Sequence, residues 1–272
     1  MRVRSILAAM AMAMALSVSC SSEGTASAGE PEGVRKGGVV APEDVEARWR
    51  VTAVDGRPVE EERNAHLSFR PGRFGGSVGC NGFGAPGLLA DGHYAISFWS
   101  SSAMACPGRL AGDQEQAVSE LMFSRPKVER LSGEALRFSG GGHSMELSYL
   151  GPNDKAEDSK EPVDLTNTLW RAIMMNGREK AVDPTNRYIR FSANGWQAQI
   201  ACATLNGTWR RDGDRLLIGE QIATTEQLCP ADLAAIDASF VALMRTNPRY
   251  LAGEMGDLLI AGGGNALTAA RR

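Results

Sequence analysis

Short runs of alternating apolar and polar residues, separated by glycine-rich turns, recur along the chain from about residue 45 onward. Their aromatic and β-branched content at a period of two is typical of half-buried strands. The clearest runs are Trp49–Val54, Ala65–Arg70, Arg73–Val78, Tyr94–Trp99, Ala135–Phe138, Ser144–Tyr149 and Asp257–Ile260. The pattern predicts short antiparallel strands joined by tight turns.

Each half of the chain also has one stretch with helical spacing. In the second half the apolar positions recur at i, i+3, i+7, i+10 and i+11, and in the first half a shorter stripe matches them. Pro230 can occupy the first turn of the second helix, and Pro248 prevents the helix from continuing. The two stripes are Leu233, Ile236, Phe240, Leu243 and Met244, and Val118, Leu121 and Met122. We predict that each stripe packs on a sheet.

The two halves align with each other. Trp49-Arg50 followed by Asp55-Gly56 matches Trp170-Arg171 followed by Asn176-Gly177, and a later Cys-Pro pair occurs in both halves. The offset between matching positions stays within 121 to 123 residues. The sequence therefore predicts two tandem copies of one domain. Its fold class is mainly β with one helix per domain (α+β), a small antiparallel sheet or partly closed barrel.

Polar, proline-containing segments set the expected boundaries between the parts of the chain. We expect a leader at 1–20, a flexible tether at 21–43, a first domain at 44–150, a linker at 151–162, a second domain at 163–262 and a C-terminal tail at 263–272.

The leader has the layout of an export signal. Met1–Arg4 is positively charged, and the apolar run Ile6–Val18 is too short to span a bilayer. Cys20 follows this run directly, which favours a lipoprotein acylated at Cys20 that touches the membrane only through its lipid and faces the periplasm. The alternative is cleavage after Ala26-Ser27-Ala28, which gives a secreted or soluble periplasmic protein.

Composition narrows the set of partners. The apolar share is 43% and the charged share 22%, as in ordinary globular proteins. The net charge is −3, and such a weak field would not recruit nucleic acid or an anionic membrane. Nucleic acid is therefore not an expected partner.

Four cysteines remain after Cys20, two in each copy at matching positions. Cys80 and Cys106 lie 26 residues apart, and Cys202 and Cys229 lie 27 apart. In an oxidising compartment this pattern predicts one disulfide within each domain. Buried free thiols are the alternative. A zinc site is disfavoured because no C-x-x-C motif and no nearby histidine accompany the cysteines.

The segments around the first cysteine pair resemble the META (HslJ-like) domain family. Gly79-Cys80-Asn81 matches its G-C-N turn, and Ser102–Cys106 matches the segment before its helix. The resemblance is fainter in the second copy, where Ala201-Cys202-Ala203 replaces the turn. It implies a small antiparallel sheet that curls toward a barrel with one helix. It also implies a role in envelope stress tolerance, to heat or antibiotics, without a defined catalytic activity.

No catalytic constellation emerges from the residues. The three histidines, His66, His93 and His143, all lie in the first copy at expected strand ends or turns, where exposed polar histidines are the ordinary outcome. Nucleophile-elbow, zinc-protease and phosphate-loop motifs are absent from the sequence. We therefore predict that the protein is not an enzyme, with no cofactor and no metal.

Features confined to the first copy mark a possible recognition loop. The glycine-rich loop expected at 79–84, with Phe83 exposed on it, and the loop around Phe98 and Trp99 have no counterpart in the second copy. Apolar side chains on loops at a barrel mouth can recognise partners, although plugs of the core are the ordinary reading. Two functions stay open: an envelope stress protein that binds a protein or peptidoglycan, and a carrier of a lipid or small apolar ligand in a barrel cavity.

Overall fold

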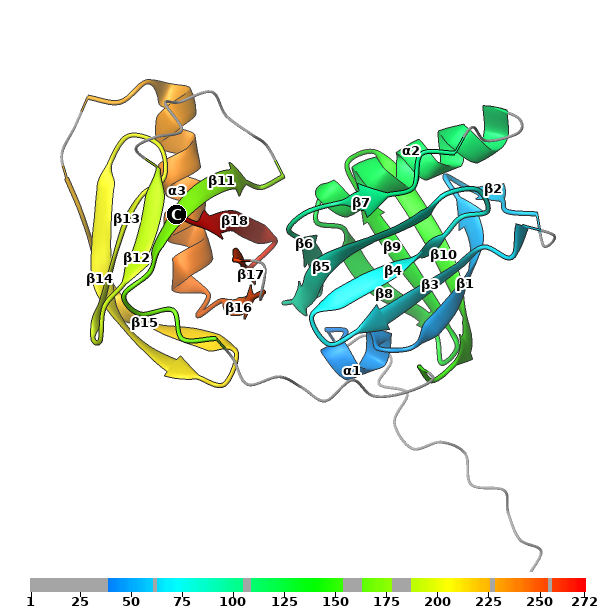
Figure 1. Cartoon of the computed structure of the whole chain (residues 1–272), viewed down its shortest axis with the longest axis horizontal. Helices are drawn as coiled ribbons and strands as arrows, with labels where there is room; N and C mark the ends of the chain where they lie inside the picture. The colour runs from blue at the N-terminus through cyan, green and yellow to red at the C-terminus, as the bar shows by residue number, and fades with distance from the viewer. Residues whose placement is uncertain are drawn as a thin grey trace, which may run out of the picture. The chain divides into compact units, whose positions relative to one another are not determined.

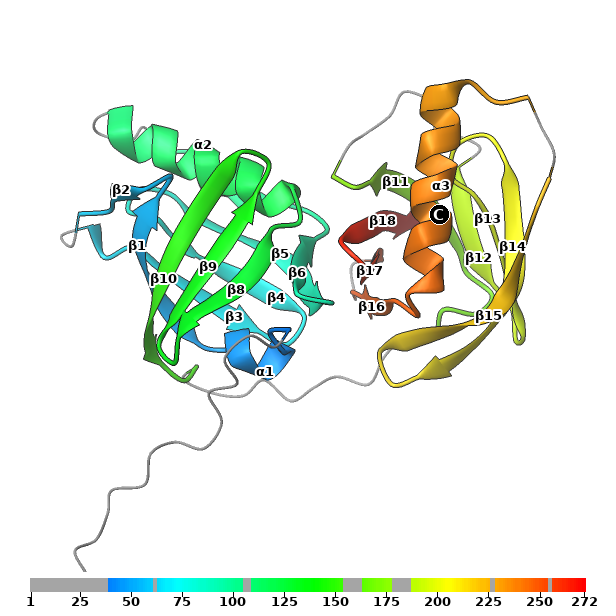
Figure 2. The ribbon, with the colours of Figure 1, turned by 180° about the vertical axis from the view of Figure 1, so that it is seen from behind.

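A computed structural model describes residues 39–60, 63–104, 109–153, 163–177, 187–225, 228–253 and 256–272. These residues form two antiparallel β-barrels in chain order, each with one long helix (Figures 1 and 2). The predicted fold class, mainly β with one helix per domain, is confirmed. Cys20, Ala26–Ala28, Cys106 and the linker residues 154–162 lie outside the described residues.

The first barrel closes on itself because its first strand pairs with both its second and its last strand. The barrel strands are β1 (Arg48–Val54), β3 (His66–Arg70), β4 (Arg73–Ser77), β5 (Gly82–Ala90), β6 (His93–Ile96), β8 (Lys127–Ser132), β9 (Ala135–Gly140) and β10 (His143–Gly151). Pairing of β10 with β1 joins the two edges of the sheet. Two short strands, β2 (Arg57–Pro58) and β7 (Ser100–Ser101), pair with β1 and β5. A four-residue helix, α1 (Pro42–Val45), precedes β1.

The second barrel repeats this order without the two short strands. Its strands are β11 (Leu169–Met175), β12 (Tyr188–Phe191), β13 (Gly195–Gln199), β14 (Thr204–Asp212), β15 (Arg215–Thr224), β16 (Arg249–Ala252), β17 (Asp257–Gly262) and β18 (Asn265–Arg271). Each pairs with the next, and β18 returns to β11. Both sheets are therefore closed barrels, which removes the exposed strand edges of an open sheet.

The long helix follows the fifth barrel strand in the chain order of both domains. Helix α2 (Arg109–Phe123) packs against β1, β6, β9 and β10, and helix α3 (Ala231–Arg245) packs against β15, β17 and β18 (Figure 2). The predicted stripes face inward, since Val118, Leu121 and Met122 are fully buried, as are Phe240, Leu243 and Met244. Pro230 caps the start of α3, and the helix ends at Arg245, ahead of Pro248. Among the described residues, no helix is long and apolar enough to cross a membrane.

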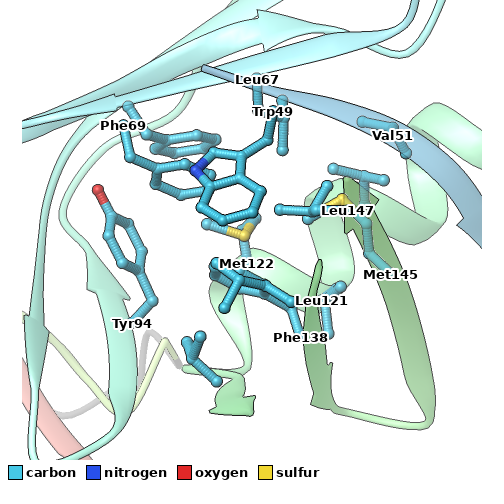
Figure 3. Packing of buried hydrophobic residues seen from close by; sticks show 14 of the residues in the cluster. Trp49, Val51, Leu67, Phe69, Tyr94, Leu121, Met122, Phe138, Met145 and Leu147 are labelled. Carbon is cyan, nitrogen blue, oxygen red and sulfur yellow. The ribbon is translucent and has the colours of Figure 1, made fainter. Parts of the chain in front are cut away.

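Side chains fill the interior of the first barrel. Every second residue of β1, β3, β9 and β10 points inward, where the side chains of α2 meet them (Figure 3). The buried side chains include Trp49, Phe69 and Phe138 from the strands and Leu121 and Met122 from α2, each no more than 2% exposed. Phe69 stacks on Phe138 with ring centroids 5.3 Å apart. The interior is thus a packed core of aromatic and aliphatic groups.

The Asp-Gly and Asn-Gly turns have the predicted conformation. Asp55 and Gly56 have φ of 51° and 72°, and Asn176 and Gly177 have φ of 58° and 67°. Two successive residues with positive φ form a turn whose twist matches that of β1 and β2, the strands on either side of Asp55-Gly56. Gly141-Gly142 and Gly263-Gly264 likewise form turns with positive φ, between β9 and β10 and between β17 and β18.

One predicted loop is a strand. The glycine-rich stretch 79–84 was expected to be a loop, but from Gly82 onward it belongs to β5, with Phe83 and Ala85 buried on the inner side. Gly84 pairs with Gly75 of β4, and a Cβ on Gly84 would stand 2.9 Å from the Phe74 carbonyl oxygen. Glycine is required here by close strand approach, and it hides the alternation that marks a strand.

The predicted C-terminal tail also differs from the structure. Residues 263–264 turn the chain, and Asn265–Arg271 form β18, whose Leu267 and Ala269 are fully buried. The small residues of this segment give a weak strand pattern, and pairing with both β11 and β17 compensates for it.

Candidate functional site

In the first domain a single asparagine joins three segments around the predicted disulfide. Asn81, in the turn before β5, accepts hydrogen bonds through its side-chain oxygen from the Met104 N–H (2.8 Å) and the Ser102 hydroxyl (3.0 Å). Its amide nitrogen donates to Glu115 of α2 (2.9 Å), which also accepts from the Asn81 backbone N–H. The turn, the segment 102–104 and the helix are therefore fixed to one another.

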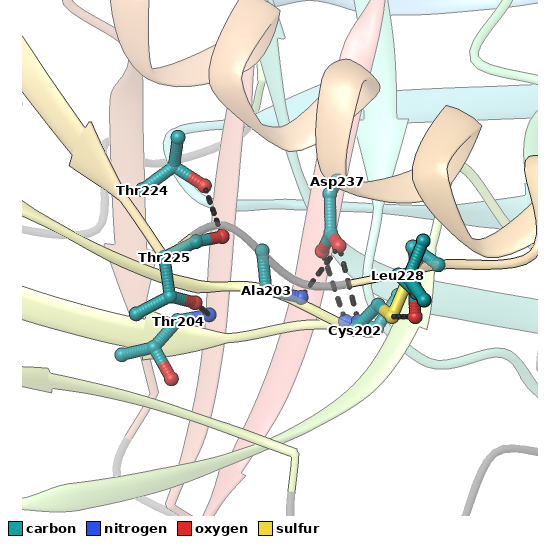
Figure 4. Close-up of a disulfide and its surroundings, with 9 residues drawn as sticks. Cys202, Ala203, Thr204, Thr224, Thr225, Leu228 and Asp237 are labelled. Carbon is teal, nitrogen blue, oxygen red and sulfur yellow. Dashed lines mark hydrogen bonds between the residues drawn. A yellow bond between two sulfur atoms is a disulfide. The ribbon is translucent and has the colours of Figure 1, made fainter.

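In the second domain a buried carboxylate binds the corresponding turn to the helix. Asp237 of α3 is 7% exposed and accepts the backbone N–H groups of Ala201 (3.1 Å), Cys202 (3.0 Å) and Ala203 (2.9 Å) (Figure 4). Three charge-assisted hydrogen bonds offset the cost of burying the carboxylate. The turn that carries Cys202 is thereby held against the helix.

The disulfide Cys202–Cys229 predicted from the sequence is present, with a Cα–Cα distance of 6.0 Å. It connects the turn between β13 and β14 to the residue just before the Pro230 cap of α3 (Figure 4). Cys80 is also disulfide-bonded. Its predicted partner, Cys106, lies outside the described residues.

The predicted recognition residues divide into two groups. Phe83 is 8% exposed and stacks on the partly buried Trp99, with ring centroids 4.6 Å apart. The prediction of an exposed Phe83 is therefore wrong, because β5 turns this side chain inward onto Phe74 and Trp99. Phe98 is 38% exposed, and the neighbouring Met104 is 60% exposed.

Phe98 and Met104 lie on the segment Ser97–Met104, which follows β6 and includes β7. The matching segment of the second domain carries Leu228, whose side chain is fully exposed, next to Cys229. Large apolar side chains in water are informative when they gather beside a rigid element. The Asn81 network, which binds Ser102 and Met104, gives the first-domain segment that rigidity.

The three histidines occupy separate places. His66 and His93 contact the backbone oxygens of Asn64 and Asp91 through Nδ1. His143, at the start of β10, is flanked by two carboxylates, with Nδ1 2.8 Å from Asp55 and Nε2 2.9 Å from Glu120. Within the described ranges, no group of three or more histidine, cysteine or acidic side chains could hold a metal ion.

Electrostatics around His143 favour its charged form. Hydrogen bonds to Asp55 and Glu120 raise the pKa of the imidazole. For Asp55, desolvation raises the pKa of the carboxyl group. Hydrogen bonds from His143 and from the Ser144 N–H outweigh this effect and lower the pKa. Hydrogen bonds from Gln116 and His143 lower the pKa of Glu120. All three groups are thus shifted toward their ionised forms.

Two small cavities lie on the first domain. One, of about 140 Å³, is lined by residues of β1, Val59, Ala65 and Leu150. The other, of about 180 Å³, lies between the β1–β2 hairpin and α2. Both are smaller than the roughly 300–1,000 Å³ usual for ligand pockets.

Comparison with known protein families shows to which family the chain belongs. The family model of the META domain matches twice, at residues 43–149 and 163–272. The chain belongs to the META domain family. Each match coincides with one barrel, so the protein is a tandem META domain protein.

Two solved structures are similar to one domain's length of this protein. An NMR structure titled only as that of a protein is 23% identical, covers 40% of this chain and 95% of its own, and has a TM-score of 0.37. An NMR structure of a protein from Burkholderia xenovorans is 18% identical, covers 39% of this chain and 82% of its own, and has a TM-score of 0.33. The search of the curated proteins found no match.

Both META domains rely on a helix carboxylate that sequence reasoning missed. Glu115 and Asp237 stand 122 positions apart, the same offset that relates Val118 to Phe240 and Met122 to Met244. An acidic residue at matching positions of the two copies, one turn before the buried stripe, was the available signal. A lone acidic residue on a helix ordinarily points to solvent, which is why the signal was overlooked.

Proposed function

We propose that this tandem META domain protein is a non-catalytic cell-envelope protein that binds a partner through the outer surface of its first META domain, in tolerance of heat or antibiotic stress. The observation that carries the proposal is the filled interior of the first barrel. A barrel without internal space recognises partners from outside.

The same packing argues against the alternative of a lipid or small-molecule carrier. Trp49, Phe69, Phe138 and Met145 occupy the volume in which an apolar ligand would sit. The cavities of about 140 and 180 Å³ border the β1–β2 region instead. Displacing several packed aromatic side chains would cost about 3–5 kcal/mol for each one.

The surface that fits the proposal is the segment Ser97–Met104. Phe98 and Met104 are exposed, and the Asn81 network keeps the segment in one conformation. Exposed apolar anchors on a pre-organised segment bind with little loss of conformational entropy. The expected partner is an envelope protein or peptidoglycan.

The cellular location of the protein is part of the proposal. Acylation at Cys20 would tether both domains to a membrane through residues 21–43. The protein should then incorporate labelled palmitate and fractionate with membranes, and Cys20→Ala should abolish both properties. A soluble wild-type protein that begins at Gly29 would instead support cleavage after Ala28.

A binding experiment with matched surface variants tests the function. The full-length protein, its Phe98→Ser/Met104→Ser variant and a Leu131→Ser control would be cross-linked in intact cells and tested for sedimentation with purified peptidoglycan. Leu131 is 50% exposed on β8, so the control removes apolar character elsewhere on the same domain.

We expect the double variant to lose the partner or the peptidoglycan and the control to keep it. Equal binding by all three proteins would contradict the proposed surface. Co-purification of a stoichiometric lipid with the wild-type protein would favour the carrier function.

A further inference from the structure

The flanking carboxylates impose a protonation requirement on His143. Both ring nitrogens lie within 2.9 Å of a carboxylate oxygen, Asp55 on one side and Glu120 on the other. Ionised carboxylates only accept hydrogen bonds, so each ring nitrogen must donate. A neutral imidazole carries one N–H and would direct the lone pair of its other ring nitrogen at a carboxylate oxygen. With both carboxylates ionised, the geometry therefore favours the imidazolium.

These contacts connect elements that are distant in the chain. Asp55 forms the tip of the β1–β2 hairpin, Glu120 lies in the last turns of α2, and His143 begins β10. The hairpin is also fixed to β10 through the backbone, because the Asp55 N–H donates to Ser144 (2.9 Å) and Asp55 accepts from the Ser144 N–H (2.8 Å). The helix arm, His143 to Glu120, depends on the imidazole alone.

The second META domain has the same joint without a titratable group. Asn176 and Asn265 replace Asp55 and His143, and Asn176 donates to the Asn265 side-chain oxygen (2.9 Å). The Asn176 side chain accepts from the Ala266 N–H (2.9 Å), and its own N–H donates to Ala266 (2.8 Å). At the helix position the second domain has Ala242, by the 122-residue offset. The joint is therefore neutral and lacks the helix arm.

We propose that His143 is a pH-sensitive latch that ties the last turn of helix α2 to the β1–β2 hairpin of the first META domain when doubly protonated and loosens that turn when neutral. The cavity of about 180 Å³ lies between the two latched elements, with Val54, Asp55 and Arg57 on the hairpin and Leu110, Gln114 and Ala117 on the helix. The charged groups facing the imidazole are Asp55, with Arg57 behind it, and Glu120.

The direction of the response follows from linkage. Because the pKa of His143 is raised in the folded protein, the latch contributes fully below the ordinary histidine value of 6.5 and is lost as pH rises through the folded value. Acidification thus tightens the first domain, and alkaline conditions loosen it. The second domain should not respond.

Nuclear magnetic resonance on the full chain tests the latch. We expect both His143 ring nitrogens to be protonated at about pH 6 and the imidazole to titrate above the ordinary histidine value of 6.5. After correction for intrinsic exchange, hydrogen-exchange protection of the amides near Glu120 should fall about fivefold between about pH 6 and pH 9. The α3 amides serve as the internal control and should show no such fall.

Variants separate the latch from general stability. His143→Asn, which reproduces the Asn265 of the second domain, should remove the pH dependence of α2 protection, whereas His66→Asn and His93→Asn should keep it. Glu120→Gln offers an amide that pairs with either imidazole form and should flatten the response while leaving the Asp55 arm. If His143→Asn fails to fold, Glu120→Gln decides the question. A His143 imidazole that titrates at or below the ordinary value of 6.5, or an unchanged α2 profile in Glu120→Gln, would overturn the proposal.

Discussion

The carboxylate of Asp237 illustrates how single residues hold these domains together. It accepts hydrogen bonds from three consecutive backbone N–H groups, those of Ala201 to Ala203. Without the carboxylate these N–H groups would lose their hydrogen-bond acceptor. In the first domain the same position is Glu115, and Asn81 supplies the remaining hydrogen bonds. Domains of this size have limited cores, so such polar joints carry a considerable share of their stability.

We predict that Asp237→Ala destabilises the second domain by about 2–4 kcal/mol, because three N–H groups lose a charged acceptor. Denaturant unfolding of the full chain measures this change. Arg245→Ala, an exposed change in the same helix, is the control and should shift stability by less than about 0.5 kcal/mol. Equal effects of the two substitutions would contradict the assigned role of Asp237.

At the scale of elements, the sequence was informative where side chains alternate and uninformative where they are small. The strand at Trp49–Val54 and both helices were predicted because large apolar residues mark their buried faces. Strands β5 and β18 were missed because Gly84, Gly87, Ala266 and Ala269 leave little pattern to detect. Glycine in a strand reflects the approach of a neighbouring strand, which the sequence alone does not reveal.

Strand β5 gives a matched pair of glycine substitutions. Gly84→Ala should destabilise the first domain by about 1–3 kcal/mol, because the new Cβ would meet the Phe74 carbonyl oxygen at 2.9 Å. Gly82→Ala in the same strand should be tolerated, since its nearest atom is 3.9 Å away. Thermal unfolding of both variants is the measurement. A loop at 82–84 would tolerate both equally.

The disulfide Cys202–Cys229 fixes the turn between β13 and β14 to the start of α3, and we expect Cys80–Cys106 to do the same in the first domain. Peptide mapping without reduction should recover Cys202–Cys229 and also Cys80–Cys106. Reduction should remove about 3 kcal/mol per 27-residue loop. For a domain of this size the melting temperature should fall by about 10–20 °C. Free thiols, or a link from Cys80 to Cys202, would contradict one disulfide per domain.

At the scale of the whole molecule, the tandem repeat was the most reliable prediction from the sequence. The landmarks Trp49 and Trp170 lie on the first strands, β1 and β11, of two closed barrels. The residues of the recognition surface were predicted only in part. Phe98 is exposed as expected, but Phe83 packs inward, because the strand that orients it could not be recognised.

Each barrel has a complete set of strands and a helix of its own, and the central claim is that each META domain is a self-contained fold. The most direct test is to record amide spectra of residues 39–153 and 163–272 expressed separately and to compare them with the full chain. We predict that each fragment gives a dispersed spectrum with most resonances at their full-chain positions, and that deleting residues 265–272 collapses the second one, because β18 closes its barrel. A collapsed spectrum for either intact fragment would contradict the account.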